Sequence, residues 1–200
     1  PFLSEYDRTK WLAHYEVALP MMQAGLPLVI VQPGVVYGPD DNGPFSTVYQ
    51  QFLQGQLLTV PQRTSFCWAH VDDIVDAHIM AMEQGTAGES YIIAGEQQSF
   101  LDAVAVMEDV TGIKANKIVL PVAALKATQA ITSIVNRVIP LRGQFHPETI
   151  RVIAGVTYLG DNGKAKREWG YDPRSLREGM RETLAHEMQK LGIQPQTQTA

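Results

Sequence analysis

The chain has 200 residues, of which 45% are hydrophobic and 18% are charged, and its net charge is −5. This composition can bury the core of one domain, or of one domain with an appendage, and the acidic balance disfavours a nucleic-acid partner. Cys67 is the only cysteine, so the chain cannot form an intrachain disulfide. We therefore expect the protein in the reducing cytoplasm and expect Cys67 to be a buried, inert thiol.

The chain opens with Tyr6 and Lys10 in the spacing Y-x-x-x-K. Residues four apart on a helix share one face, so this phenol and this ammonium can serve one site. A nearby cation favours the phenolate form, which would let Tyr6 exchange a proton with a substrate hydroxyl or carbonyl. An ordinary amphipathic helix can carry the same two residues, so the pair needs support from the segments that follow it.

The next segments have the order expected of an α/β protein. A helix is predicted over residues 10–24, with Gly25 as its C-cap, and the apolar run 26–31 predicts a strand of a parallel sheet. Residues 32–39 form a predicted loop with proline and glycine at its turns. Open α/β sheets bind ligands outside the carboxyl ends of their strands, so this loop is a candidate ligand contact.

The rest of the chain continues this alternation without internal repeats. The predicted elements are a strand at 64–69, a helix at 71–84, a strand at 90–94, a helix from Ser99 with Asp102 in a capping box, a strand at 117–120, helices at 122–139 and 147–154, and a last helix from the capping box Ser175 to Glu178 as far as Gly192. The helix at 122–139 is too polar to span a bilayer, so no membrane partner is expected.

Three segments, residues 6–11, 33–39 and 68–74, resemble in order and spacing the extended short-chain dehydrogenases/reductases, the NAD-dependent epimerase/dehydratase family. Residues 88–96 and 164–171 are similar to that family too. The resemblance implies an α/β fold: the remainder of a Rossmann-like, doubly wound parallel sheet with a mixed α/β substrate cap. It assigns residues 1–93 to the remainder of the NAD(P)-binding domain with cap insertions, 94–192 mostly to the cap, and 193–200 to a disordered tail.

The resemblance also implies roles for individual residues. Tyr6 is expected to be the catalytic acid/base, and Lys10 to assist it and to hold the nicotinamide ribose of NAD or NADP. The expected wall against the nicotinamide ring consists of Pro33, Gly34, Val35 and Val36. The candidate substrate contacts are Tyr37, Asn42 and Arg151.

Other charged residues have simpler interpretations. Arg151 occupies the place of a diphosphate-binding arginine of nucleotide-sugar enzymes, but the aspartate that accompanies it there is absent. Asp72 is interpreted as a helix cap and His70 as a satisfied structural histidine. No metal site is expected.

The sequence departs from the family pattern in its phosphate site. The glycine-rich turn G-x-x-G-x-x-G occurs nowhere in the 200 residues, and no segment before Tyr6 can hold the family's catalytic serine or threonine. Pyrophosphate binding therefore cannot be assigned to residues of this chain. We expect the chain to be the C-terminal part of a longer enzyme.

Three functions remain open at this point. The leading one is an NAD(P)-dependent oxidoreductase that transfers hydride to or from a small-molecule carbonyl or hydroxyl, similar to the dihydroflavonol reductases. The second is a nucleotide-sugar epimerase or dehydratase with bound NAD. The third is an inactive fragment or interaction module. The resemblance also makes a homodimer possible.

Overall fold

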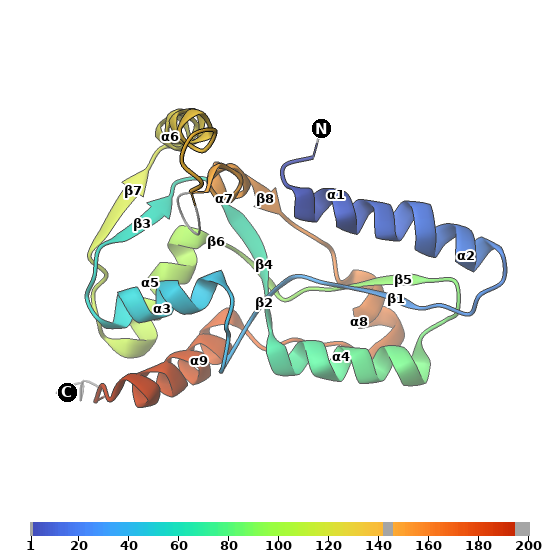
Figure 1. The fold of residues 1–200 in the computed structure, drawn as a ribbon. Coiled ribbons are helices and arrows are strands. Elements are labelled where there is room, and N and C mark those ends of the chain that lie inside the picture. Colours follow the sequence, from blue (N-terminus) through green and yellow to red (C-terminus); the bar gives the residue numbers. More distant parts are fainter. Residues whose placement is uncertain (1, 142–145, 195–200) are drawn as a thin grey trace.

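The computed structural model describes residues 2–141 and 146–194 as a mixed α/β fold (Figure 1). The helices are α1 (Glu5–Leu12), the π-helix η1 (Ala13–Ala18), α2 (Leu19–Gln23), α3 (Pro44–Leu53), α4 (Val71–Gln84), α5 (Phe100–Thr111), α6 (Val122–Val135), α7 (Pro147–Ile153), α8 (Gly163–Trp169) and α9 (Leu176–Leu191). The strands are β1 (Ile30–Pro33), β2 (Val35–Tyr37), β3 (Leu58–Pro61), β4 (Ser65–His70), β5 (Ser90–Ile93), β6 (Glu96–Ser99), β7 (Lys117–Leu120) and β8 (Thr157–Tyr158).

Most of the strand pairs are parallel, as the sequence predicted. β1 pairs with β5 in the register Ile30 to Ser90, and β3 pairs with β7. The central sheet has the order β2-β4-β6, and β6 is its antiparallel member. β8 joins β4 in parallel beside Ser65 and Phe66. Parallel strands are usually covered on both faces, but β7 is not, since Ile118 and Val119 are 49% and 41% exposed.

Two glycines let the chain pass from one sheet to the next. Between β1 and β2, the N–H of Gly34 donates to the carbonyl of Ile93 at 3.0 Å, and a Cβ on Gly34 would lie 2.5 Å from the carbonyl oxygen of Cys67. Between β5 and β6, a Cβ on Gly95 would lie 1.9 Å from the carbonyl oxygen of Trp68. Both positions therefore require glycine, because the backbones approach too closely for a side chain.

Helices cover both faces of the β1–β5 pair. Figure 1 shows α1 and α2 along one face and α4 with α8 along the other. Under α4 and α8 the core buries Tyr91, Ile93 and Trp169, and the rings of Tyr91 and Trp169 have centres 3.9 Å apart. A second core, which includes Phe52 and Trp68, lies where α3, α5 and α9 pack around β2, β3 and β4. The carboxyl end of β1 lies between these two cores.

The first helix is not the continuous α-helix predicted for residues 10–24. In η1, which joins α1 to α2, the N–H of Leu19 bonds to the carbonyl of His14, five residues earlier. Pro20 follows immediately; it has no N–H, and in an α-helix its ring would crowd the carbonyl of Glu16. The wider π turn relieves that clash. The helix then ends at Gln23, and Gly25 has the left-handed φ of 95° expected after a helix.

The remaining differences from the sequence prediction have tertiary causes. The strand predicted at 26–31 begins at Ile30, where pairing with β5 begins. Residues 35–37, predicted as loop, form β2 because they pair with β4. The helix predicted to reach residue 139 ends at Val135, whereas α4 and both capping boxes are confirmed. The elements that the sequence did not predict are α3, β3, β6, β8 and α8.

Within residues 2–141 and 146–194, every helix is too short or too polar to cross a membrane. Most of the tail for which disorder was predicted, residues 195–200, lies outside the described residues. Cys67 is buried in β4, as predicted for an inert thiol.

Candidate active site

Tyr6 and Lys10 lie one turn apart near the start of α1. Ser4 caps this helix, because its hydroxyl oxygen accepts the N–H of Asp7 at 3.0 Å. The Nζ of Lys10 lies 5.4 Å from the centre of the Tyr6 ring, and Tyr6 is 67% exposed. None of the ion pairs between described residues involves Lys10. The pair is therefore accessible to a ligand.

Residues from late in the chain hold the turn of α1 that carries Tyr6. The guanidinium of Arg151, on α7, donates to the carbonyl of Leu3 at 3.3 Å. The hydroxyl of Tyr158, on β8, donates to the carboxylate of Asp7 at 3.5 Å. The structure thus brings Arg151, one of the candidate substrate contacts, next to the segment of Tyr6.

A groove beside this segment contains two cations. It encloses about 410 Å³ and is lined by Leu3, Lys126, Gln129, Arg151, Ala154, Gly155 and Val156. Lys126 comes from α6 and Arg151 from α7, and neither forms an ion pair with another described residue. The groove can attract an anionic or strongly polar ligand.

The predicted nicotinamide wall lies where β1 passes into β2. Pro33 ends β1, Gly34 crosses against β4, and Val35 and Val36 begin β2. Pro33 is exposed, and Val36 is 40% exposed, so an apolar surface is available at the carboxyl end of β1. In the described part of the chain, no hydrogen bond links this wall to Tyr6 or Lys10.

Tyr37 and Asn42 lie on the side of α9, and no contact joins them to the Arg151 groove in the part of the chain that the structure describes. Tyr37 is 1% exposed, and burial raises the pKa of its hydroxyl above the ordinary value. Its substrate role is therefore not favoured, since the side chain belongs to the core. Asn42 is exposed, and its amide nitrogen donates to the carbonyl of Asp40 at 3.0 Å.

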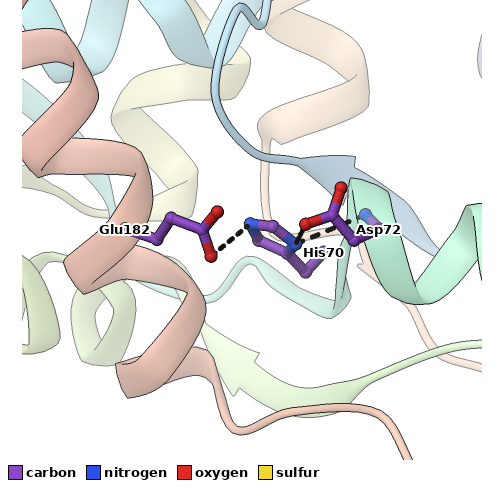
Figure 2. A group of neighbouring side chains, drawn as sticks. All are labelled: His70, Asp72 and Glu182. Carbon is purple, nitrogen blue, oxygen red and sulfur yellow. Dashed lines mark hydrogen bonds and ion pairs between the residues drawn. The ribbon is translucent and has the colours of Figure 1, made fainter.

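The cap of α4 is His70, so the prediction that Asp72 caps this helix is wrong. His70 Nδ1 accepts the N–H of Asp72 at 3.3 Å. Figure 2 shows the imidazole between the carboxylates of Asp72 and Glu182, with Nε2 at 3.8 Å from a Glu182 oxygen. The prediction of a satisfied histidine is wrong for one ring nitrogen, because Nε2 is buried without a hydrogen-bond partner within the described residues. Burial, and then the cation of Arg174, lower the pKa of His70.

Arg174 joins this histidine region to α9. Its Nε lies 2.9 Å from Asp73, and its Nη1 lies 3.0 Å from Glu182. The ligand atoms of His70, Asp72 and Glu182 lie within 4.8 Å of one another, but Arg174 already supplies the cation for these carboxylates. Sequence reasoning missed this network, because its members come from two segments about 100 residues apart in the chain.

The comparisons with known proteins agree with the resemblance seen in the sequence. Residues 1–94 match the model of the NAD dependent epimerase/dehydratase family. Sterol demethylase protein B of Methylococcus capsulatus is 26% identical over 187 residues, which are 91% of this chain and 56% of that protein. A putative dihydroflavonol 4-reductase of Synechocystis is 30% identical over 125 residues, 60% of this chain and 36% of that protein.

Solved structures confirm the Rossmann-like fold class. The crystal structure of gox2253 has a TM-score of 0.76 and 26% identity, and the match covers 94% of this chain and 57% of gox2253. Other structures of similar fold are complexes with NAD or with NADPH. The chain spans about half the length of these proteins.

Proposed function

We propose that the chain is the catalytic and substrate-binding part of an NAD(P)-dependent oxidoreductase, because residues 1–94 match the model of the NAD dependent epimerase/dehydratase family. The proposed reaction moves a hydride to or from a carbonyl or hydroxyl substrate. The observation that carries the proposal is the exposed pair on α1, in which Lys10 Nζ lies 5.4 Å from the ring of Tyr6. In this proposal residues 1–93 are the remainder of the nucleotide-binding domain and 94–192 are mostly cap.

Each residue of the proposed site has a distinct task. Tyr6 passes a proton between its hydroxyl and the substrate oxygen, and the ammonium of Lys10 stabilises negative charge on the phenol oxygen and bonds the ribose hydroxyls. The exposed apolar wall at Pro33 and Val36 fits the face of a nicotinamide ring and keeps water from it. The nicotinamide cofactor, when bound, donates or accepts the hydride.

A substitution on α1 tests the acid/base role. Tyr6→Phe, in the protein expressed from its full reading frame, is expected to lower kcat by about 10²- to 10⁴-fold and to leave the Kd for NAD(P)H within about twofold. Tyr15→Phe is the matched control, because Tyr15 is half exposed on the same helical segment but packs against Trp11, with the ring centres 5.1 Å apart. Turnover that survives in Tyr6→Phe would remove the basis for this assignment.

The cofactor proposal has its own test. Because the 200 residues contain no glycine-rich phosphate turn, the 200-residue chain alone is expected to show no micromolar binding of NADH or NADPH by calorimetry. Tight binding by this chain would show that another part of it holds the pyrophosphate. Failure of this test leaves the role of Tyr6 untouched, since the two measurements concern different groups.

A second candidate function is a nucleotide-sugar epimerase or dehydratase. The groove that contains Arg151 and Lys126 beside the start of α1 favours it, because a guanidinium can pair with a diphosphate. NAD that co-purifies with the protein, together with a rise in Tm on addition of UDP-sugars, would support this candidate over a carbonyl reductase. An Arg151→Gln variant should then lose the UDP-sugar effect.

A further inference from the structure

The start of α1 is bound to α7 at two backbone groups. The carboxylate of Glu148 accepts the N–H of Glu5 at 2.6 Å, and the guanidinium of Arg151 donates to the carbonyl of Leu3 at 3.3 Å. Residues three apart on a helix share one face, so both contacts come from the same face of α7. Figure 1 shows α7 beside the N-terminal end of α1. We call Glu148 and Arg151 the α7 clamp.

The α7 clamp holds the backbone on both sides of the residue that caps α1. This residue is Ser4, which is buried and whose hydroxyl oxygen accepts the N–H of Asp7. The first N–H groups of a helix have no partner within the helix, and Glu148 and Ser4 satisfy two of them. A carboxylate at this position also interacts favourably with the helix dipole. The clamp therefore completes the N-terminal cap of the turn that contains Tyr6.

A third contact with this turn comes from β8. The hydroxyl of Tyr158 donates to the carboxylate of Asp7, and the ring of Tyr158 stacks on Phe66, with ring centres 6.1 Å apart and planes 13° apart. Phe66 is buried in β4, so this contact relates α1 to the central sheet. The three contacts reach residues 3, 5 and 7, and they therefore flank Tyr6 in the sequence.

The side chain of Tyr6 has no contact of this kind. It is 67% exposed, and its hydroxyl forms no hydrogen bond with any residue in 2–141 or 146–194. The end turns of a helix unwind more readily than its middle. A displacement of a reacting group by about 1 Å can lower a rate by about 10²-fold. The position of the Tyr6 hydroxyl therefore depends on the contacts that its backbone neighbours make.

The docking of α7 has anchors other than Glu148. Ile150 is buried against Leu125 of α6, and the hydroxyl of Thr64 donates to the carbonyl of Ile153 at the end of α7. These contacts hold α7 against α6 and the central sheet. The bond between Glu148 and Glu5 thus acts on α1, because α7 is already held without it.

On the premise that Tyr6 is the acid/base, as proposed above, we infer that Glu148 is a positioning residue. It keeps the first turn of α1 wound and so fixes the place of the Tyr6 hydroxyl. Glu148 has this role because it binds the N–H directly before Tyr6, and a carboxylate makes a stronger hydrogen bond than a neutral acceptor. Arg151 also lines the groove beside α1, so its variants would test two functions at once.

Amide hydrogen exchange, followed by NMR on the 200-residue chain, tests the inference. Glu148→Ala should speed the exchange of the Asp7 and Arg8 amides about tenfold, because loss of a hydrogen bond to a charged group lets the whole turn open. The acceptors of these two amides belong to Ser4, so their exchange reports the turn and not the deleted bond itself. Glu148→Gln should restore slow exchange at least in part, since an amide oxygen also accepts an N–H.

Kinetics in the protein expressed from its full reading frame show whether Glu148 acts through Tyr6. With NADPH and acetophenone as the probe ketone, Glu148→Ala should lower kcat by about tenfold or more and leave the Kd for NADPH within about twofold. In a Tyr6→Phe background, Glu148→Ala should cause no further loss, because the hydroxyl that it positions is absent.

The matched control is Ser99→Ala, which removes the N-cap of α5 and leaves α1 untouched. It should lower Tm about as much as Glu148→Ala does and leave both kcat and the exchange of the Asp7 and Arg8 amides unchanged. Unchanged exchange in Glu148→Ala overturns the inference, and so does an equal acceleration in Ser99→Ala or a kcat loss that persists in the Tyr6→Phe background. The exchange measurement needs neither substrate nor cofactor, so its failure is distinct from a failure of the acid/base role, which Tyr6→Phe alone tests.

Discussion

Replacing Gly179 by alanine tests whether Tyr37 belongs to the core rather than to a ligand site. A Cβ on Gly179 would lie 2.1 Å from the hydroxyl oxygen of Tyr37, 2.8 Å from its Cζ and 3.0 Å from Cδ2 of His70. Tyr37 is 1% exposed, and its ring packs edge-on against Trp68 and His70. The ring cannot move aside without opening the core around α9.

The magnitude follows from two opposing effects. Overpacking of a core costs about 1–3 kcal/mol, and the upper end applies here because the overlap is with a fully buried ring. Alanine in place of glycine stabilises a helix interior by about 1 kcal/mol. The net loss for Gly179→Ala is therefore about 2 kcal/mol, which lowers Tm by about 4–8 °C in a chain of this size.

Thermal unfolding followed by circular dichroism measures this effect. Adding Tyr37→Phe to Gly179→Ala removes the hydroxyl oxygen nearest to the new methyl group and should restore part of the lost stability. Tyr37→Phe alone relieves no overlap, because Gly179 has no side chain. A Gly179→Ala variant with an unchanged or higher Tm would refute the reasoning, because helix propensity would then outweigh the overlap.

Two further predictions concern the charged network beside His70. In a urea titration, Arg174→Gln should lower the free energy of unfolding by about 2 kcal/mol, because the buried carboxylate of Asp73 loses its cation. The control Arg177→Gln breaks an exposed ion pair and should change the free energy of unfolding by less than about 1 kcal/mol. Because the pKa of His70 is lowered from 6.5 in the folded chain, the stabilisation due to neutral His70 is complete above pH 6.5 and is lost as the pH falls through the folded-state pKa. The unfolding free energy should thus fall more steeply on acidification in the wild type than in His70→Asn, and equal slopes would contradict this.

Local signals in the sequence predicted local structure well. The capping boxes at Ser99 and Ser175 and the full extent of α4 needed only residues within one or two turns. β2 was missed because a strand of three residues is defined by its partner, β4, and has no periodicity of its own. η1 was missed because six residues are too few to show a period different from that of an α-helix, and Pro20 alone marked the difference.

In the candidate site too, the sequence predicted the local arrangement and missed the contacts between distant segments. The common helix of Tyr6 and Lys10 could be predicted from their spacing, and their chemical roles stay a prediction. The contact of Arg151 with Leu3 could not be predicted, since it depends on how α7 docks on α1. The burial of Tyr37 was also hidden, because the glycine that admits its ring lies in α9, far along the chain.

The two glycines that press on β4 have a consequence for the evolution of this fold. Gly34 and Gly95 meet the carbonyls of neighbouring residues in one strand, so a side chain at either position would displace β4 and, with it, the end of the strand at His70. Selection at these two positions then depends on backbone geometry and is independent of the reaction that is catalysed. Homologues that have diverged to new substrates, or have lost Tyr6 altogether, should still carry glycine at both positions, which makes the pair a marker of common descent rather than of shared chemistry.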